Sequence, residues 1–204
     1  MGSVLDLYKS KYDYVEHKYF SVFQVPLTTA DNQKTTAQVG NVSLYVNMYH
    51  ESDRCQEEIA KLNELSSKYS SNENADKNKG LQIIGLPTTD ILIANPSSNI
   101  AQEILKFKPN FLILKPLDCN GQEMGEIFKF LKRYSPLFSF DIGKSSRLQR
   151  HFYKFLCDRY GLLHKFYTPE VGYDVIEKDI QELLAEQFDN NEYDSIIDPP
   201  EDLF

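Results

Sequence analysis

The chain has 204 residues, of which 41% are hydrophobic and 25% are charged, and its 30 acidic and 22 basic residues give a formal net charge of −8. This length suits one domain whose core needs neither disulfides nor a metal to hold it together. The negative charge argues against nucleic acid or an anionic membrane surface as a partner, because both bind basic surfaces. No apolar run approaches the roughly 20 residues of a membrane span, and the first residues lack the charged and apolar regions of a signal peptide.

Three cysteines, Cys55, Cys119 and Cys157, are spread along the sequence without a CxxC spacing. An odd number of cysteines at such spacings argues against a disulfide framework, and neither they nor the histidines show the spacing of zinc ligands. We therefore expect a protein without a metal or cofactor in a reducing compartment, with the cytoplasm as its location.

Apolar and aromatic residues recur at helical spacing in the first part of the chain. They are Val4, Leu5, Tyr8, Tyr12, Val15 and Tyr19. This spacing predicts an amphipathic helix over residues 3–18, so that residues 1–19 form an N-terminal helical extension. Lysines and acids are balanced in this segment, which favours a helix that packs on protein over a membrane anchor.

The next part of the chain alternates between two kinds of segment. Short β-prone runs predict strands, and apolar residues three or four positions apart predict helices. In chain order we expect a strand at 42–46, a helix at 59–69, a polar surface loop at 66–79, a strand at 81–85, a helix at 99–107, a strand at 111–114, a helix at 126–134, a hairpin of strands at 152–157 and 163–167, and a helix at 176–184. This order is typical of an α/β protein with a central mixed sheet flanked by helices, as in thioredoxin-like folds.

The last segment, residues 188–204, carries six acidic residues and no basic one, with two prolines near its end. Such a composition predicts an extended or disordered acidic tail. The tail either keeps the protein soluble or docks on a protein partner through Ile196-Ile197 and the final Leu203-Phe204. The N-terminal helix is the other candidate contact surface for a partner.

Several segments resemble the glutathione peroxidase family. Residues 41–47 (NVSLYVN) resemble its first core strand, which ends in Val-Asn just before the catalytic loop, and residues 80–87 (GLQIIGLP) resemble its G-L-x-I-L-G-F-P segment. Residues 151–158 (HFYKFLCD) resemble N-F-x-K-F-L-V-D. Further matches are 118–121 (DCNG), 128–132 (FKFLK), 167–169 (YTP) and 176–180 (IEKDI). Their order and spacing extend the resemblance over residues 20–187, which we take as one glutathione peroxidase-like domain.

The resemblance implies a thioredoxin-like fold and a chemistry that reduces hydroperoxides at the expense of glutathione or thioredoxin. The family uses a peroxidatic cysteine or selenocysteine in the loop before the first helix, surrounded by a glutamine, a tryptophan and an asparagine. In this chain the four positions fall on Ser52, Asp90, Arg150 and His151. A one-residue insertion would move the first to Asp53. Since a serine hydroxyl cannot form a sulfenic acid, the family chemistry cannot run at Ser52. The usual resolving-cysteine positions fall on Thr88 and near Phe107.

Cys55 is an alternative nucleophile, because it lies three residues beyond Ser52. With Ser52 as the N-cap of the following helix, the two side chains would share a face, and the helix dipole would lower the pKa of the thiol. Four nearby carboxylates oppose this effect: Glu51, Asp53, Glu57 and Glu58. We expect the carboxylates to prevail over Arg54 and His50, which leaves a mostly protonated thiol. The plain alternative is a half-buried cysteine without redox function, and Cys119 and Cys157 look like core residues.

A second chemistry is open to the four positions. Ser52, His151 and Asp90 form a Ser–His–Asp set if the family pocket persists, with Arg150 free to bind an anion. Against a hydrolase, Ser52 has no glycine-flanked elbow. The plain alternative is that Asp90 pairs with Arg150 or His151 and fills the pocket.

Two functions therefore remain. The first is a catalytically inactive glutathione peroxidase-like protein that binds or regulates. The second is a divergent thiol peroxidase that reduces hydroperoxides through Cys55 in the oxidative-stress response. The segment at 136–150 is short, which resembles family members that lack an oligomerisation loop. We therefore expect a monomer.

Overall fold

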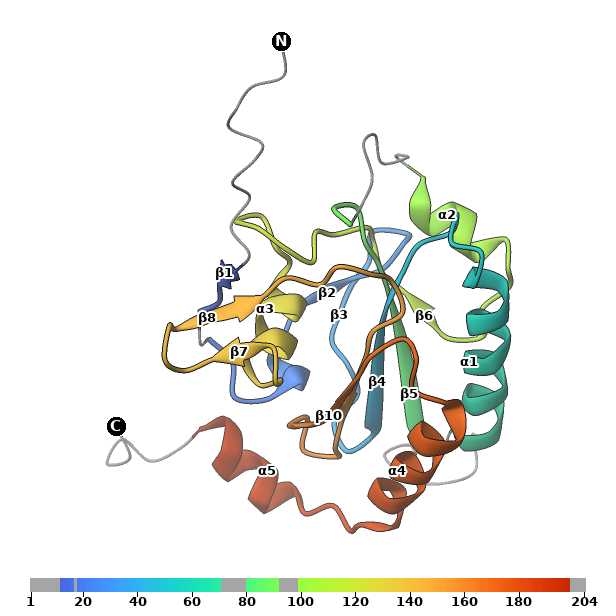
Figure 1. Cartoon of the computed structure of the whole chain (residues 1–204). Coiled ribbons are helices and arrows are strands. Elements are labelled where there is room, and N and C mark those ends of the chain that lie inside the picture. The colour runs from blue at the N-terminus through green and yellow to red at the C-terminus, as the bar shows by residue number, and fades with distance from the viewer. Residues whose placement is uncertain (1–11, 17, 71–79, 92–98, 199–204) are drawn as a thin grey trace.

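The computed structural model describes residues 12–16, 18–70, 80–91 and 99–198. Within these residues a five-stranded mixed sheet has the strand order β10-β9-β4-β5-β6 (Figure 1). The last three strands of this order run parallel, whereas β9 is antiparallel to both of its neighbours. The strands are β4 (Val42–Met48), β5 (Leu81–Pro87), β6 (Leu112–Ile113), β9 (Lys154–Cys157) and β10 (Leu163–Tyr167). The predicted central mixed sheet and the hairpin of its last two strands are confirmed.

The central strand β4 is buried along its whole length. Side chains alternate between the two faces of a strand. Leu44 and Val46 accordingly join one hydrophobic cluster, and Tyr45 joins the other. Because both faces are covered, the strand is apolar on both faces except at Ser43 and Asn47, which are also buried.

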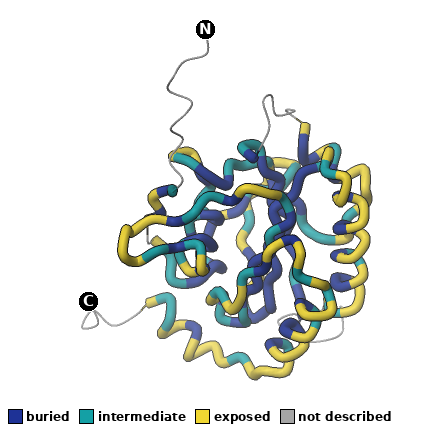
Figure 2. The backbone as a smooth tube through the Cα atoms, viewed as in Figure 1, coloured by how far each residue is buried: buried dark blue, intermediate teal, exposed yellow. Residues whose placement is uncertain are grey.

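Helices cover both faces of the sheet (Figure 1). Figure 2 shows exposed positions along the outer sides of the helices, while the inner strands β4, β5 and β9 are buried almost throughout. The cluster that contains Leu44 includes residues of α1 (Cys55–Tyr69), α2 (Ile100–Leu105) and α4 (Tyr173–Ala185). The cluster that contains Tyr45 includes residues of the 3-10 helix η2 (Val22–Gln24), α3 (Glu126–Arg133) and α5 (Asn190–Ile197). None of the helices within the described residues is long and apolar enough to cross a membrane.

Two small sheets were not predicted from the sequence. One has the order β1-β8-β7, and the other pairs β2 with β3. Their strands are β1 (Tyr12–Tyr14), β2 (Leu27–Thr28), β3 (Lys34–Thr35), β7 (Phe138–Ser139) and β8 (Lys144–Ser146). Each has only two or three residues, too few for an alternating pattern to stand out.

The predicted N-terminal helix is wrong over residues 12–14, which form strand β1. Tyr12 and Tyr14 pair with β8, and Asp13 between them is buried. Two tyrosines at alternate positions fit a strand as well as a helix, and pairing with β8 decides between them. Residues 15, 16 and 18 are not helical either, and the rest of the predicted helix, at 3–11 and residue 17, lies outside the described residues.

The disordered tail is also wrong where the structure describes it, because residues 190–197 form α5. Asp189 caps this helix by accepting a hydrogen bond from the Asn191 backbone N–H at 2.8 Å. The buried Tyr193 ring lies 6.0 Å from the Phe23 ring and 6.1 Å from the Phe188 ring. An aromatic anchor therefore holds an otherwise acidic helix on the core, while residues 199–204 lie outside the described part.

The predicted surface loop at 66–79 begins later than expected. Helix α1 continues to Tyr69, so the prediction is wrong for residues 66–69, and residues 71–79 lie outside the described part. Ser66 is buried, and its hydroxyl donates to the Asn110 carbonyl at 3.4 Å. A polar residue at the end of a helix thus has a tertiary partner, which composition alone does not show.

Candidate functional site

The candidate site lies where β4 ends and the loop before α1 begins. Tyr49, the first residue after β4, is buried, and its hydroxyl donates to the Glu51 carboxylate at 2.7 Å. Its ring stacks on the His151 ring with 5.0 Å between centroids. The sequence analysis did not single out Tyr49, although its place directly after the central strand could have drawn attention to it.

Asn47 brings the segment with Arg150 and His151 to this end of β4. Its side-chain amide donates to the Arg150 carbonyl at 2.9 Å and accepts from the Tyr153 backbone N–H at 2.7 Å. Its own carbonyl accepts from the Phe152 backbone N–H at 2.7 Å. Phe152 has a φ of 67°, a left-handed conformation rare outside glycine, and these three hydrogen bonds hold it there.

His151 is half-buried, and it lies beside Thr88, the residue that follows β5. Its Nδ1 lies 3.3 Å from the Thr88 hydroxyl. Burial lowers the pKa of His151 to about 4, and the nearby Asp90 carboxylate only partly opposes this shift. The imidazole is therefore neutral at pH 7, and it contributes a hydrogen-bonding and stacking surface rather than a positive charge.

Asp90 faces the interior instead of forming an ion pair. Its Oδ1 accepts from the Cys119 backbone N–H at 2.8 Å, and its buried Oδ2 has no hydrogen-bond partner among the described residues. Arg150 instead pairs with Glu170, and both side chains are exposed. The expected Asp90–Arg150 pair is thus wrong, because Asn47 holds Arg150 by its backbone and leaves its side chain at the surface. The alternative pair with His151 is limited to electrostatic attraction, since no hydrogen bond is formed between the described side chains.

Ser52 stands apart from the proposed Ser–His–Asp set. It is half-buried, its backbone N–H donates to the Tyr49 carbonyl at 3.4 Å, and its carbonyl accepts from the Cys55 N–H at 2.8 Å. Among the described residues no hydrogen bond joins its hydroxyl to His151 or Asp90. Helix α1 has Arg54 as its N-cap residue, so the expected cap at Ser52 is wrong. The structure brings Asp90 and His151 near each other without completing a triad.

Cys55 is the first residue of α1 and is only 1% exposed. Burial, followed by the neighbouring Glu58 carboxylate, raises the pKa of the thiol to about 11. The expectation of a protonated thiol is confirmed, but its main cause is burial, and of the four carboxylates considered only Glu58 contributes. The thiol does not open into the site beside Arg150 and His151. It packs in the hydrophobic cluster of α1 and β4.

A buried charge cluster lies directly beside Cys55. The Glu58 carboxylate lies 2.8 Å from Arg54 Nη2 and 3.0 Å from Lys154 Nζ, and it accepts a 2.6 Å hydrogen bond from the Tyr173 hydroxyl. Sequence reasoning missed this cluster. Its signals were a lysine inside a strand-forming apolar run and an arginine and a glutamate four positions apart on a helix.

The other two cysteines are core residues, as expected. Cys119 and Cys157 are fully buried, and burial raises the pKa of both thiols. Within the described residues there is no group of three or more histidine, cysteine or acidic side chains that could hold a metal ion.

Comparison with known proteins identifies the family. No family model matches the chain. A chloroplastic phospholipid hydroperoxide glutathione peroxidase from Pisum sativum is 38% identical over 151 residues, which cover 72% of this chain and 58% of that protein. Glutathione peroxidase 1 from Helianthus annuus is 30% identical over 152 residues, which cover 72% of this chain and 82% of that protein. The chain belongs to the glutathione peroxidase family.

The fold agrees with this assignment. The crystal structure of T. cruzi GPX1 superposes with a TM-score of 0.60 at 21% identity, covering 80% of this chain and 96% of that one. The predicted thioredoxin-like fold of the glutathione peroxidase type is confirmed. The chain spans 58% of the length of its pea relative, so the activity and substrates of the whole relative are matters for proposal.

Proposed function

We propose that this glutathione peroxidase-like protein is a binding or regulatory homologue that does not reduce hydroperoxides. The observation that carries the proposal is the state of the thiols. All three cysteines of the sequence lie in the described part of the chain, all three are buried, and the pKa of each is raised. At a pKa of about 11, roughly one Cys55 thiol in ten thousand is ionised at pH 7, and the thiolate is the form that attacks a peroxide.

The residues at the four family positions support the same conclusion. Ser52 stands at the position that the resemblance assigns to the peroxidatic residue, and a hydroxyl gives no sulfenic acid. Asp90 lacks the amide N–H that a glutamine at this position would donate to a thiolate or a peroxide, and its Oδ1 already accepts from the Cys119 backbone N–H. Arg150, the cation of the set, is engaged by Glu170 at the surface.

The competing function is a divergent thiol peroxidase that uses Cys55 with glutathione or thioredoxin as reductant. Cys55 is the first residue of α1, only three positions beyond Ser52, which is the observation in its favour. Its burial and the adjacent Glu58 carboxylate argue against it, because α1 would have to shift to expose the sulfur. A hydrolase built on Ser52 has less support, since Ser52 is not joined to His151.

The location and assembly of the protein are part of the proposal. Three buried free cysteines suit a reducing compartment, and we propose a cytoplasmic monomer. The acidic segment over 188–198 is available for contact with a protein partner, because helix α5 buries Tyr193 and exposes most of its other residues.

A peroxidase assay tests the proposal. Consumption of hydrogen peroxide and of a lipid hydroperoxide is followed with glutathione and, separately, with a thioredoxin system as reductant. We expect the wild type to consume peroxide no faster than buffer without protein. Turnover that is lost in Cys55→Ser and kept in the matched core variant Cys157→Ser would establish the competing function instead.

A further inference from the structure

A pocket away from the cysteines lies between β1, β8 and α3. Its volume is about 480 Å³, within the range of small-molecule sites. The lining side chains used below are Asp13, Tyr14, Lys129, Lys144 and Arg147. Gly121 and Gln122 close one side through the turn before α3, and Tyr12 and Glu16 complete the lining.

The Asp13 carboxylate, in the wall of the pocket, holds three donors in place. The carboxylate is buried, and it accepts from Lys132 Nζ at 2.8 Å, from Arg147 Nη1 at 3.2 Å and from the Gly121 backbone N–H at 3.0 Å. Two cations on one carboxylate leave a surplus positive charge, and the exposed Glu16 carboxylate, which also lines the pocket, offsets part of it. Lys132 is fully buried, so the part of this surplus that a ligand can reach is on Arg147.

Most N–H donors of the Arg147 guanidinium are available to a ligand. One of its five N–H groups donates to Asp13, and within the described residues the others have no partner. The bond to Asp13 holds the guanidinium in one place, so a ligand meets a pre-ordered fork of donors. Such a fork matches the oxygens of a carboxylate or a phosphate.

Lys144 adds a second available cation. It is exposed, and within the described residues it makes no ion pair. In the register of β1 and β8 it stands directly opposite Tyr14, so the two side chains lie on the same side of the small sheet. Tyr14 is 73% exposed, so its ring is open to contact with a ligand.

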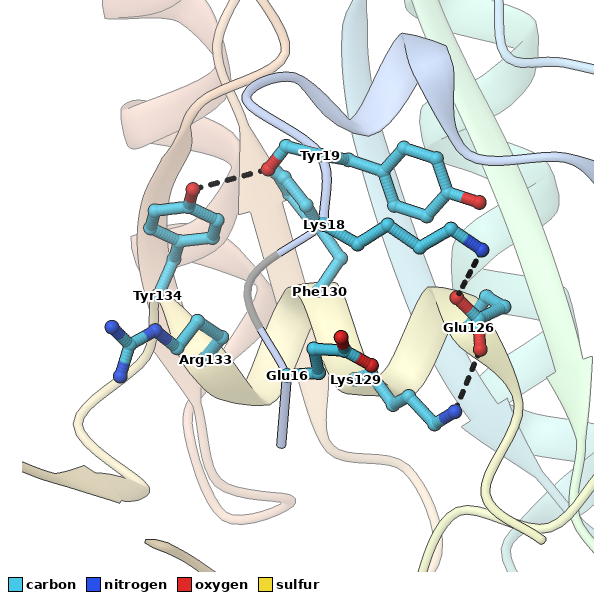
Figure 3. A pocket seen from close by; sticks show the side chains of 8 residues that line it. All are labelled: Glu16, Lys18, Tyr19, Glu126, Lys129, Phe130, Arg133 and Tyr134. Atoms are coloured by element: carbon cyan, nitrogen blue, oxygen red, sulfur yellow. Dashed lines mark hydrogen bonds and ion pairs between the residues drawn. The ribbon is translucent and has the colours of Figure 1, made fainter. Parts of the chain in front are cut away.

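Lys129 contributes less, as Figure 3 shows. Its ammonium lies 2.6 Å from the Glu126 carboxylate, which it shares with Lys18, so its charge is partly offset. The hollow in Figure 3, between Tyr19 and α3, has a volume of only about 10 Å³ and holds no more than a water molecule. The larger pocket is therefore the one that can take a ligand.

We propose that this pocket binds a small organic anion, with its carboxylate or phosphate group on Arg147 and Lys144 and its apolar or aromatic body against Tyr14. In a chain of net charge −8, this local surplus of positive charge discriminates in favour of anions. The site is independent of the cysteines, and it gives a non-catalytic member of the family something to bind.

Ligand titrations followed by NMR test the proposal. The probes are phenyl phosphate and phenylacetate, with inorganic phosphate to test the need for a body and benzyl alcohol to test the need for a charge. We expect at least one of the two aromatic anions to bind with a Kd of about 1 mM or tighter at low salt, shifting backbone amides at 121–122 and 144–147. The tighter of the two aromatic anions shows whether the pocket prefers a phosphate or a carboxylate group. Inorganic phosphate and benzyl alcohol should bind about tenfold more weakly than that anion.

Two lysine variants make the test specific. Lys144→Gln removes an unpaired surface charge without touching the fold, and it should weaken binding of the aromatic anion about tenfold. Lys178→Gln, a matched change of an exposed lysine on α4, should leave binding unchanged. Equal effects of the two variants, equal binding of the neutral probe, or no amide shift at about 10 mM anion would overturn the proposal.

Discussion

Lys154 Nζ lies 3.0 Å from Glu58 Oε2, and neither side chain is more than 2% exposed. This pair joins α1 to β9, an interior strand of the sheet, directly beside Cys55. Burial lowers the pKa of Lys154, and the Glu58 carboxylate partly opposes that shift. The same carboxylate raises the pKa of the Cys55 thiol. One buried carboxylate therefore both completes the packing of α1 and suppresses the reactivity of the neighbouring sulfur.

Removal of this carboxylate should destabilise the protein. Glu58→Gln leaves Lys154 buried without its counter-ion, which costs about 3 kcal/mol of unfolding free energy. Chemical denaturation measures the loss. The double variant Glu58→Met/Lys154→Met removes both charges and should be more stable than Glu58→Gln, whereas Glu64→Gln, at an exposed position of α1, should match the wild type. A Glu58→Gln protein as stable as the wild type would show that the pair does not hold α1.

The neutral His151 predicts a pH dependence of stability. Its pKa is about 4 in the folded protein against an ordinary value of 6.5, so between these values the unfolded chain binds the additional proton. Stability from this group is therefore complete above pH 6.5 and is lost as the pH falls toward 4. With allowance for partial exposure of the ring, the loss is about 1 to 2 kcal/mol.

The measurement is the unfolding free energy of the wild type and of His151→Asn at several pH values between about 3.5 and 7.5, chosen to bracket the two pKa values. Carboxylates titrate in both proteins, so the difference between the two curves isolates the histidine. We expect that difference to shrink as the pH falls. A constant difference would mean that folding does not lower the pKa of His151.

The anchor of α5 gives a third prediction. Tyr193→Ala should lower the unfolding free energy by about 2 kcal/mol, because it removes a buried ring from its contacts with Phe23 and Phe188. Asp194→Ala, at an exposed position of the same helix, is the control and should have little effect. If both variants kept the stability of the wild type, α5 would not be part of the folded core.

Much of the fold could be predicted from the sequence, because its large elements have strong local signals. The segments at 42–46 and 81–85 are apolar enough that their local pattern predicts buried strands without knowledge of their tertiary partners. Short elements depend instead on distant partners: β1 exists because β8 pairs with it, and α5 because Tyr193 finds Phe23. Local patterns alone could not distinguish these from a helix and a disordered tail.

The resemblance implied that Ser52, Asp90, Arg150 and His151 gather around one pocket. It did not imply that Asn47 holds the segment at 150–151 through the Arg150 carbonyl. The side-chain pairs could not be predicted, because a charge in the sequence does not say which opposite charge it will face. Arg150 forms an ion pair with Glu170, and the Glu58–Lys154 pair joins residues far apart in the chain.

A fourth prediction tests whether position 52 could hold a reactive thiol. Ser52 is half-buried, unlike Cys55, so the sulfur of Ser52→Cys should be reached by iodoacetamide in the native protein. Wild-type protein should remain unmodified until it is unfolded, because its three thiols are buried and protonated. Mass spectrometry of the alkylated peptides measures both. An equally slow reaction in Ser52→Cys would place this position outside the accessible site.

The most direct measurement is the trapping of sulfenic acid on the native wild-type protein. After treatment with hydrogen peroxide and a dimedone-type probe, peptide mass spectrometry should find no adduct on Cys55, Cys119 or Cys157, while protein unfolded before treatment is labelled. An adduct on Cys55 of the native protein that disappears in Cys55→Ser would contradict the proposal and establish a working redox cysteine.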